Sequence, residues 1–274
     1  RGKYLHKDKF FGTAEPYPKG GFGFCDVVLG WDAHDVCYDN TQVTGWQHGF
    51  PDALARLDLG THRNVPWDNN VDFFLGEFVN ADGSPHPVCP RQTLKRVLKR
   101  TEKLGFQAMT GMEFEWFNFA ETPQTWAAKK GVGPESLTPG MFGYSLLRAN
   151  QNREFFGAII DEMLAFGVPI EGLHTETGPG VYEAAIGFSE ALEQADRAIL
   201  FKAGTKEIGS RFGITLLALA QHRAYSLPLF FGAVTVIALI VHAAILTNTT
   251  WFGKYWEGKA RPAAASIVNP GHFG

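Results

Sequence analysis

The stretch GMEFEWF at residues 111–117 alternates apolar residues with two carboxylates, Glu113 and Glu115. Successive side chains of a strand point to opposite faces, so a strand here places both glutamates on one face of a sheet. A second pair, Glu176 and Glu183, lies in the glycine- and proline-containing segment HTETGPGVYE at residues 174–183. Oxygen-rich clusters of this kind suit Mg²⁺ or Mn²⁺, although two solvated glutamates on an exposed strand would give the same pattern.

Strand-like and helix-like segments alternate around these pairs. Period-two and β-prone runs predict strands at residues 22–29, 71–79, 108–119 and 174–185. Apolar residues at helical spacing predict helices at residues 92–104, 152–166 and 189–212. Gly167 and Gly213 directly follow the last two helices, as expected for helix C-termini. This order predicts an α/β or α+β unit that extends to about Gly213.

A charge-free run begins near Leu227, and from there to Leu246 only Thr235 and His242 are polar. Roughly 20 helical residues reach about 30 Å, the thickness of the hydrocarbon core, so a single membrane-spanning helix is predicted. A buried helix of a soluble domain is the alternative. An imidazole inside such a span costs free energy unless its nitrogens are used. His242 is therefore a candidate ligand for a macrocycle metal, and Ala238, one turn earlier, leaves room for a flat ligand.

The segment FFGAVTVIALIVHAAILTNTTWF at residues 230–252, continued through Tyr255 and Trp256, resembles the alpha polypeptide of the peripheral light-harvesting complex of purple bacteria. The resemblance implies that His242, with Ala238 beside it, binds the magnesium of bacteriochlorophyll a. It also implies that Tyr255 and Trp256 donate hydrogen bonds to acetyl groups of coupled pigments. The alternatives are a histidine satisfied by a neighbouring helix and a generic aromatic belt at the membrane interface.

The light-harvesting resemblance carries further expectations about partners and location. It implies a carotenoid, a light-harvesting beta polypeptide and a ring-shaped oligomer in the bacterial inner, photosynthetic membrane. Basic residues before the span, among them Arg211 and Arg223, favour a cytoplasmic N-terminus for this single-pass chain. A formal net charge of −3 gives no reason to expect a nucleic-acid partner.

Residues 1–214 resemble glutamine synthetase and related ATP-dependent carboxylate–amine ligases. The motifs that carry this resemblance, besides the two glutamate pairs, are GWQHGFPD at 45–52, PWD at 66–68 and CPR at 89–91. The resemblance implies that Glu115, Glu176 and Glu183 bind one divalent cation, Mg²⁺ or Mn²⁺, and that Glu113 belongs to the site of another. It also implies ATP as a substrate.

In the ligase family a metal-binding histidine loop and the arginines that hold ATP and glutamate are expected after Gly213-Ile214. None of these follows in this sequence. A ligase needs those charges to neutralise the transferred phosphoryl group. We therefore expect no catalytic residues and no unaided ligase turnover. A pigment-binding antenna that absorbs light and passes on excitation energy is the favoured function, and the ligase is the alternative.

The predicted fold class is α+β followed by a single transmembrane helix. Its α+β part combines a partial β-grasp with a partial glutamine-synthetase-like catalytic domain. The predicted segments are a β-grasp-like segment at 1–104, a catalytic segment at 105–214, a junction at 215–226 and a light-harvesting segment at 227–274.

Overall fold

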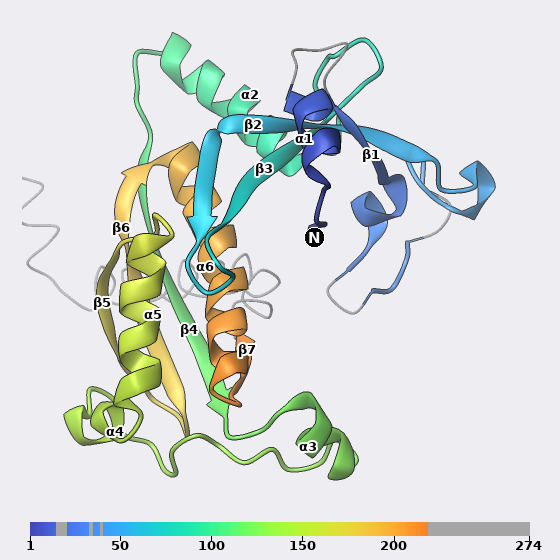
Figure 1. Cartoon of the computed structure of the whole chain (residues 1–274). Helices are drawn as coiled ribbons and strands as arrows, with labels where there is room; N and C mark the ends of the chain where they lie inside the picture. The colour runs from blue at the N-terminus through green and yellow to red at the C-terminus, as the bar shows by residue number, and fades with distance from the viewer. Residues whose placement is uncertain (15–20, 33–34, 39–40, 219–274) are drawn as a thin grey trace, which may run out of the picture. The chain divides into compact units, whose positions relative to one another are not determined.

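The protein is represented by a computed structural model, which describes residues 1–14, 21–32, 35–38 and 41–218 (Figure 1). Contacts divide the chain into two units, Arg1–Leu219 and Ala220–Gly274. The described residues all lie in the first unit and form two antiparallel sheets, one with the strand order β1-β2-β3 and one with the order β5-β6-β4-β7.

The first sheet is built from β1 (Phe22–Cys25), β2 (Asp52–Val65) and β3 (Val71–Val79). The prediction of a strand at 71–79 is confirmed, whereas the predicted strand at 22–29 ends at Cys25 and continues as the 3-10 helix η1 (Asp26–Gly30). The turn between β2 and β3 places Asn69 and Asn70 at φ 51° and 55°, a left-handed conformation that asparagine tolerates well. Two further elements precede β2: α1 (Lys7–Ala14) and the 3-10 helix η2 (Trp46–His48).

The second sheet is built from β4 (Met109–Phe119), β5 (Ile170–Thr175), β6 (Val181–Glu190) and β7 (Thr215–Ala218). The remaining helices are α2 (Pro90–Lys103), α3 (Pro123–Ala128), α4 (Leu146–Gln151), α5 (Arg153–Ala165) and α6 (Ala191–Arg211). The three predicted helices are thereby confirmed as α2, α5 and α6, while α3 falls within a stretch with no predicted element. The predicted strand at 174–185 is in fact the end of β5, a turn and the start of β6.

Two glycines end the long helices as the sequence predicts. Gly167 has φ 78°, and the next amide, that of Val168, donates to the Met163 carbonyl over 2.8 Å. Gly213 has φ 68°, and the Ile214 amide donates to Gly209 over 2.9 Å. A left-handed residue followed by this long-range bond satisfies carbonyls at the helix end. Both chain reversals lead into strands of the second sheet.

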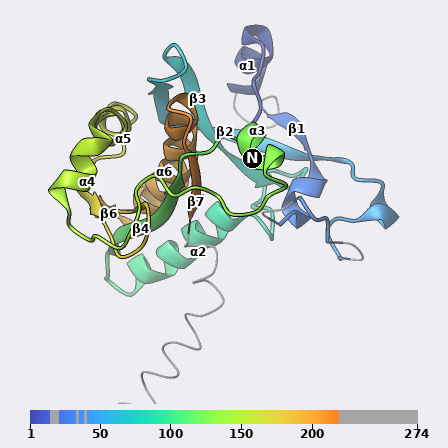
Figure 2. The same ribbon diagram turned by 90° about the horizontal axis from the view of Figure 1, so that it is seen from below.

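One face of the second sheet carries the hydrophobic core. Trp116 and Tyr182 project from the strands, and Phe155, Ile159 and Phe201 reach them from α5 and α6. Figures 1 and 2 show these two helices running alongside the sheet. Because side chains alternate along a strand, burial of Trp116 at 3% exposure sends its neighbour Glu115 to the opposite face. The core thus determines which face receives the carboxylates.

Arg91 on α2 links the first sheet to α6. Its guanidinium donates to Asp58 of β2 over 2.7 Å, pairs with Glu77 of β3, and donates two bonds to Asp196 of α6 over 2.8 and 2.9 Å. The side chain of Arg91 is only 13% exposed. Since paired charges replace hydration here, the network holds elements from both halves of the described chain together.

The predicted membrane span, Leu227–Leu246, lies outside the described residues. Within residues 1–218, gaps aside, no helix combines the length and the apolar character that crossing a membrane requires. The mixed helix-and-strand character predicted up to Gly213 is confirmed by the fold of this part of the chain. The predicted segment boundaries at 104, 214 and 226 stay predictions.

Candidate metal centre

A row of three polar side chains crosses the second sheet on the face opposite the core. Glu115 of β4 is the register partner of Glu183 of β6, and Glu183 is in turn the partner of His174 of β5. Residues directly opposite each other on neighbouring strands share a face and lie close together. Glu113, two residues before Glu115, lies on the same face and is exposed. The strand register therefore gathers side chains that are far apart in the sequence.

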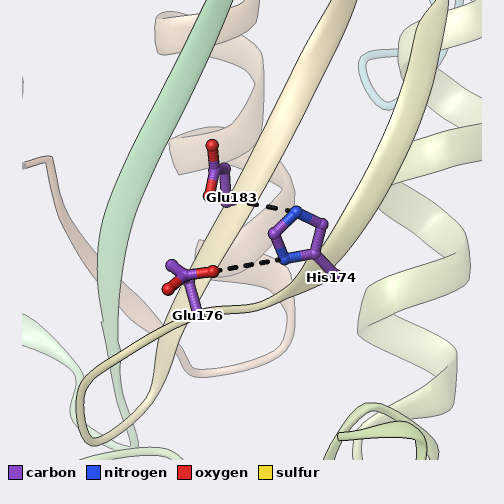
Figure 3. Close-up of side chains that lie close together, drawn as sticks. All are labelled: His174, Glu176 and Glu183. Atoms are coloured by element: carbon purple, nitrogen blue, oxygen red, sulfur yellow. Dashed lines mark ion pairs between the residues drawn. The ribbon is translucent and has the colours of Figure 1, made fainter. Parts of the chain in front are cut away.

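His174, Glu176 and Glu183 approach each other most closely, as Figure 3 shows. The His174 Nδ1 atom lies 3.7 Å from Glu176 Oε2, and its Nε2 atom lies 3.8 Å from Glu183 Oε2. One ligand atom from each residue can be chosen so that all three lie within 4.8 Å of one another. All three side chains are partly buried. This spacing leaves room for one cation among three donors.

The negative charges in this row influence one another. Burial raises the pKa of Glu183, and the nearby charge of Glu115 raises it further, with smaller contributions from Glu113 and Glu176. His174 acts in the opposite direction on Glu183. The pKa of Glu176 is lowered instead, because its carboxylate accepts bonds of 2.7 and 2.8 Å from the hydroxyl and the amide of Thr177. A bound cation would relieve the mutual repulsion of these carboxylates.

Asn118 of β4 holds the turn between Glu176 and Glu183 by hydrogen bonds. The Asn118 side chain is fully buried, and its amide group donates to the Gly180 carbonyl over 2.9 Å. The backbone N–H of Asn118 donates to the same carbonyl, also over 2.9 Å. Gly180 has φ 71°, and a Cβ at this position would lie 2.5 Å from the Asn118 carbonyl oxygen. Glycine is therefore required at this position, and the turn holds two of the glutamates in place.

A cavity of about 810 Å³ lies between α5 and β5, and His174 is the one residue of the cluster that lines it. Its lining includes Phe156 and Asp161 of α5, Leu173 and His174 of β5, and Tyr144 before α4. The Tyr144 ring is stacked on the His174 imidazole, with centroids 4.0 Å apart and planes inclined by 17°. The histidine thus lies between an aromatic ring and two carboxylates.

The structure brings the four predicted glutamates to one neighbourhood. Glu115 and Glu183 are register partners with Glu113 on the same face, and donor atoms of Glu176 and Glu183 lie within 4.8 Å of each other. His174 was absent from the predicted site, yet with Glu176 and Glu183 it forms the one group of three potential metal ligands among the described residues. The sequence offers one partial signal, since His174 stands two residues before Glu176, but the approach of His174 to Glu183 depends on the pairing of β5 with β6. The predicted pigment positions Ala238, His242, Tyr255 and Trp256 lie outside the described residues.

The described part of the chain has a glutamine-synthetase-like mixed α/β fold. Residues 87–222 match the family described as glutamine synthetase, catalytic domain. The chain is 53% identical over 221 residues to type-1 glutamine synthetase 2 of Dictyostelium discoideum, which covers 81% of this chain and 42% of that protein. It is 29% identical over 224 residues to a glutamate–isopropylamine ligase of a Pseudomonas species, covering 82% and 48% respectively. The chain therefore spans less than half the length of these relatives.

Solved structures agree on the fold. A ligand-free GmaS structure superposes with a TM-score of 0.57 at 23% identity, covering 72% of this chain and 42% of that one. A glutamine synthetase structure from Plasmodium falciparum gives a TM-score of 0.55 at 15% identity, covering 78% and 42%. At these identities the likeness concerns the fold alone.

The prediction of an antenna function is wrong. A short match to the antenna complex alpha/beta subunit family covers residues 226–252, outside the described part. The relatives that cover four fifths of the chain are named as a glutamine synthetase and a glutamate–isopropylamine ligase. The expected bacteriochlorophyll a, carotenoid, light-harvesting beta polypeptide and membrane ring are corrected on this ground. So is the expected single-pass location in a photosynthetic inner membrane with a cytoplasmic N-terminus, which was predicted from the apolar run at 227–246, the basic residues before it and the same resemblance.

Proposed function

We propose that this chain carries the divalent-metal part of the active site of an ATP-dependent carboxylate–amine ligase of the glutamine synthetase type. The observation that carries the proposal is the row of Glu115, Glu183 and His174 across three strands, with Glu176 beside it. The proposal is supported by the ligase names of the relatives and by the match of residues 87–222 to the catalytic domain.

The donor set fits Mg²⁺ or Mn²⁺. Carboxylate oxygens are preferred by both hard cations, and one imidazole nitrogen shifts the preference towards Mn²⁺. Glu115, Glu176 and Glu183 would hold one ion with His174 as a further donor, and Glu113 would serve a second ion. When bound, such cations neutralise negative charge that develops on a transferred phosphoryl group.

The backbone selects the tautomer of His174 that can act as a ligand. The Nδ1 atom lies 3.1 Å from the Thr175 carbonyl oxygen. A carbonyl only accepts hydrogen bonds, so this contact requires the proton on Nδ1. The lone pair is then on Nε2, the atom that faces Glu183 at 3.8 Å. A metal-ligating histidine commonly donates its other ring N–H in this way.

The substrate class follows from the names of the relatives. One relative is named as a glutamine synthetase, one as a glutamate–isopropylamine ligase and one, from Streptomyces coelicolor, as a gamma-glutamylethanolamide synthetase. We accordingly assign glutamate and ammonia, or a small organic amine, as the pair to be condensed with ATP. This hypothesis replaces the expectation of a catalytically silent segment.

Metal binding and turnover test the proposal together on the full 274-residue chain. Mn²⁺ binding is measured by the loss of the EPR signal of the free ion. Ligation is measured by the γ-glutamyl hydroxamate that forms from glutamate, hydroxylamine and ATP. We expect Glu183→Gln to weaken Mn²⁺ binding by at least about tenfold and to abolish hydroxamate formation. Glu102→Gln on α2 removes an exposed carboxylate outside the cluster and serves as the control. Equal Mn²⁺ affinity in both variants would exclude the proposed site.

A further inference from the structure

Tyr144 has a strained backbone that its own burial does not explain. Its φ is 56°, a left-handed conformation that is uncommon for a bulky side chain. The residue is 72% exposed, so the strain is not compensated by burying the ring in a core. Such outliers persist when the surrounding structure holds them, and they are concentrated at functional sites.

Thr175 holds the Tyr144 backbone in this conformation. The Tyr144 amide donates to the Thr175 carbonyl over 2.7 Å, and the Ser145 amide donates to Thr175 Oγ1 over 2.8 Å. The Thr175 hydroxyl in turn donates to the Phe142 carbonyl over 2.9 Å. Thr175 itself is 3% exposed at the end of β5. Three bonds thus fasten the loop before α4 to the residue that follows His174.

The consequence of this attachment is the stack of Tyr144 on His174. With centroids 4.0 Å apart and planes 17° from parallel, the phenol ring covers one face of the imidazole. The edge of the imidazole remains directed at Glu176 through Nδ1 and at Glu183 through Nε2. A ring stacked on one face cannot turn about its χ2 without losing that contact.

We propose that Tyr144 is a positioning residue that fixes the His174 imidazole as a donor in the divalent-metal site. The inference rests on the proposed metal site and adds a role for a residue outside the cluster. Strain in the Tyr144 backbone is maintained by the bonds to Thr175, and the stack transmits that geometry to His174. A residue that orients a metal-ligating histidine raises the affinity for the metal without itself contacting the metal.

The test compares Mn²⁺ affinity, measured by EPR, with thermal unfolding for variants of the full chain. Tyr144→Phe keeps the stack, so we expect Mn²⁺ affinity within about twofold of the parent chain. Tyr144→Gly removes the ring but accepts the left-handed backbone without strain, so we expect about tenfold weaker binding with an unchanged or higher Tm. Phe142→Ala removes another exposed aromatic ring of the same loop and should leave the affinity unchanged. A residue with a merely structural role would move Tm and affinity together.

A double-mutant comparison identifies the route of the effect. In a His174→Ala background, Tyr144→Gly should weaken Mn²⁺ binding no further, because the group it positions is gone. Parent-like affinity in Tyr144→Gly, or a full additional loss in the His174→Ala background, would overturn the inference and leave the metal site standing. Failure of the parent chain to bind Mn²⁺, or indifference of binding to Glu183→Gln, would overturn both proposals.

Discussion

Glu115 and Glu183 face each other across β4 and β6 as direct register partners. Like charges placed opposite each other on neighbouring strands destabilise a sheet, and Glu183 is also partly buried. The arrangement has a rationale if a cation is bound between the strands, because the repulsion that weakens the metal-free fold is then replaced by attraction.

Glu115→Gln should therefore change stability in opposite directions with and without metal. In EDTA, loss of one facing charge should raise the free energy of unfolding by roughly 0.2–1 kcal/mol. With Mn²⁺ at about 100 times the dissociation constant, the parent chain should gain about 2.7 kcal/mol, and the variant should gain much less. Urea unfolding under both conditions measures the two effects. A variant that loses stability in EDTA would contradict this account of the pair.

The acid side of the stability profile should depend on Glu121. Its pKa is lowered to about 2, first by the hydrogen bond from Lys129, then by the Thr125 hydroxyl and the Glu135 amide. A lowered carboxyl pKa stabilises the fold above the unfolded value, 4.5, and this contribution is lost as the pH falls towards 2. Glu121→Gln should thus be less stable than the parent at pH 6, with the difference shrinking between pH 4.5 and 2. Urea unfolding at several pH values in that range measures the difference in unfolding free energy between the two chains. A difference that does not change with pH would contradict this prediction.

Gly180 is expected to be intolerant of a side chain. Gly180→Ala would place Cβ 2.5 Å from the Asn118 carbonyl oxygen, at φ 71°. We expect a loss of about 1–3 kcal/mol in unfolding free energy and weaker Mn²⁺ binding, because the turn that carries Glu176 and Glu183 must shift. Gly157 on α5 has open space around it, so Gly157→Ala should instead stabilise by about 0.5–1 kcal/mol. Equal effects of the two substitutions would refute the steric argument.

Arg91→Met should be among the most destabilising single substitutions in the described chain. It leaves Asp196 without its cationic partner and leaves Asp58 and Glu77 with Lys95 alone, in a partly buried setting. Breaking a buried ion pair from one side costs about 3–5 kcal/mol. Arg96→Met, on the exposed side of the same helix, should cost less than about 0.5 kcal/mol. If the two variants unfold at the same urea concentration, the Arg91 network contributes little to the stability of the fold.

Local patterns in the sequence predicted much of this fold. The alternation around Glu113 and Glu115 predicts β4, and the glycines at 167 and 213 mark the ends of α5 and α6. By contrast, the 14 residues of β2 were not predicted as a strand. Their burial is irregular, since the strand shifts register between Asp58 and Arg63, and no simple period-two signal results.

Sequence spacing alone could not identify His174 as part of the site. Its closeness to Glu183 depends on how β5 pairs with β6, which is a tertiary property. The wrong antenna prediction had a different origin. It preferred the short light-harvesting resemblance at residues 230–256 to the longer ligase resemblance at residues 1–214, because the histidine loop and arginines of the ligase family do not follow Gly213-Ile214. The completeness of a short motif was thus given more weight than the length of the longer match.

The central claim is that His174, Glu176 and Glu183 bind a divalent cation, and pulsed EPR of Mn²⁺ added to the full chain tests it most directly. The account predicts electron spin-echo modulation from one histidine nitrogen, present in the parent chain and absent in His174→Gln. Modulation that persists in His174→Gln, or bound Mn²⁺ without any histidine nitrogen in the parent chain, would contradict it.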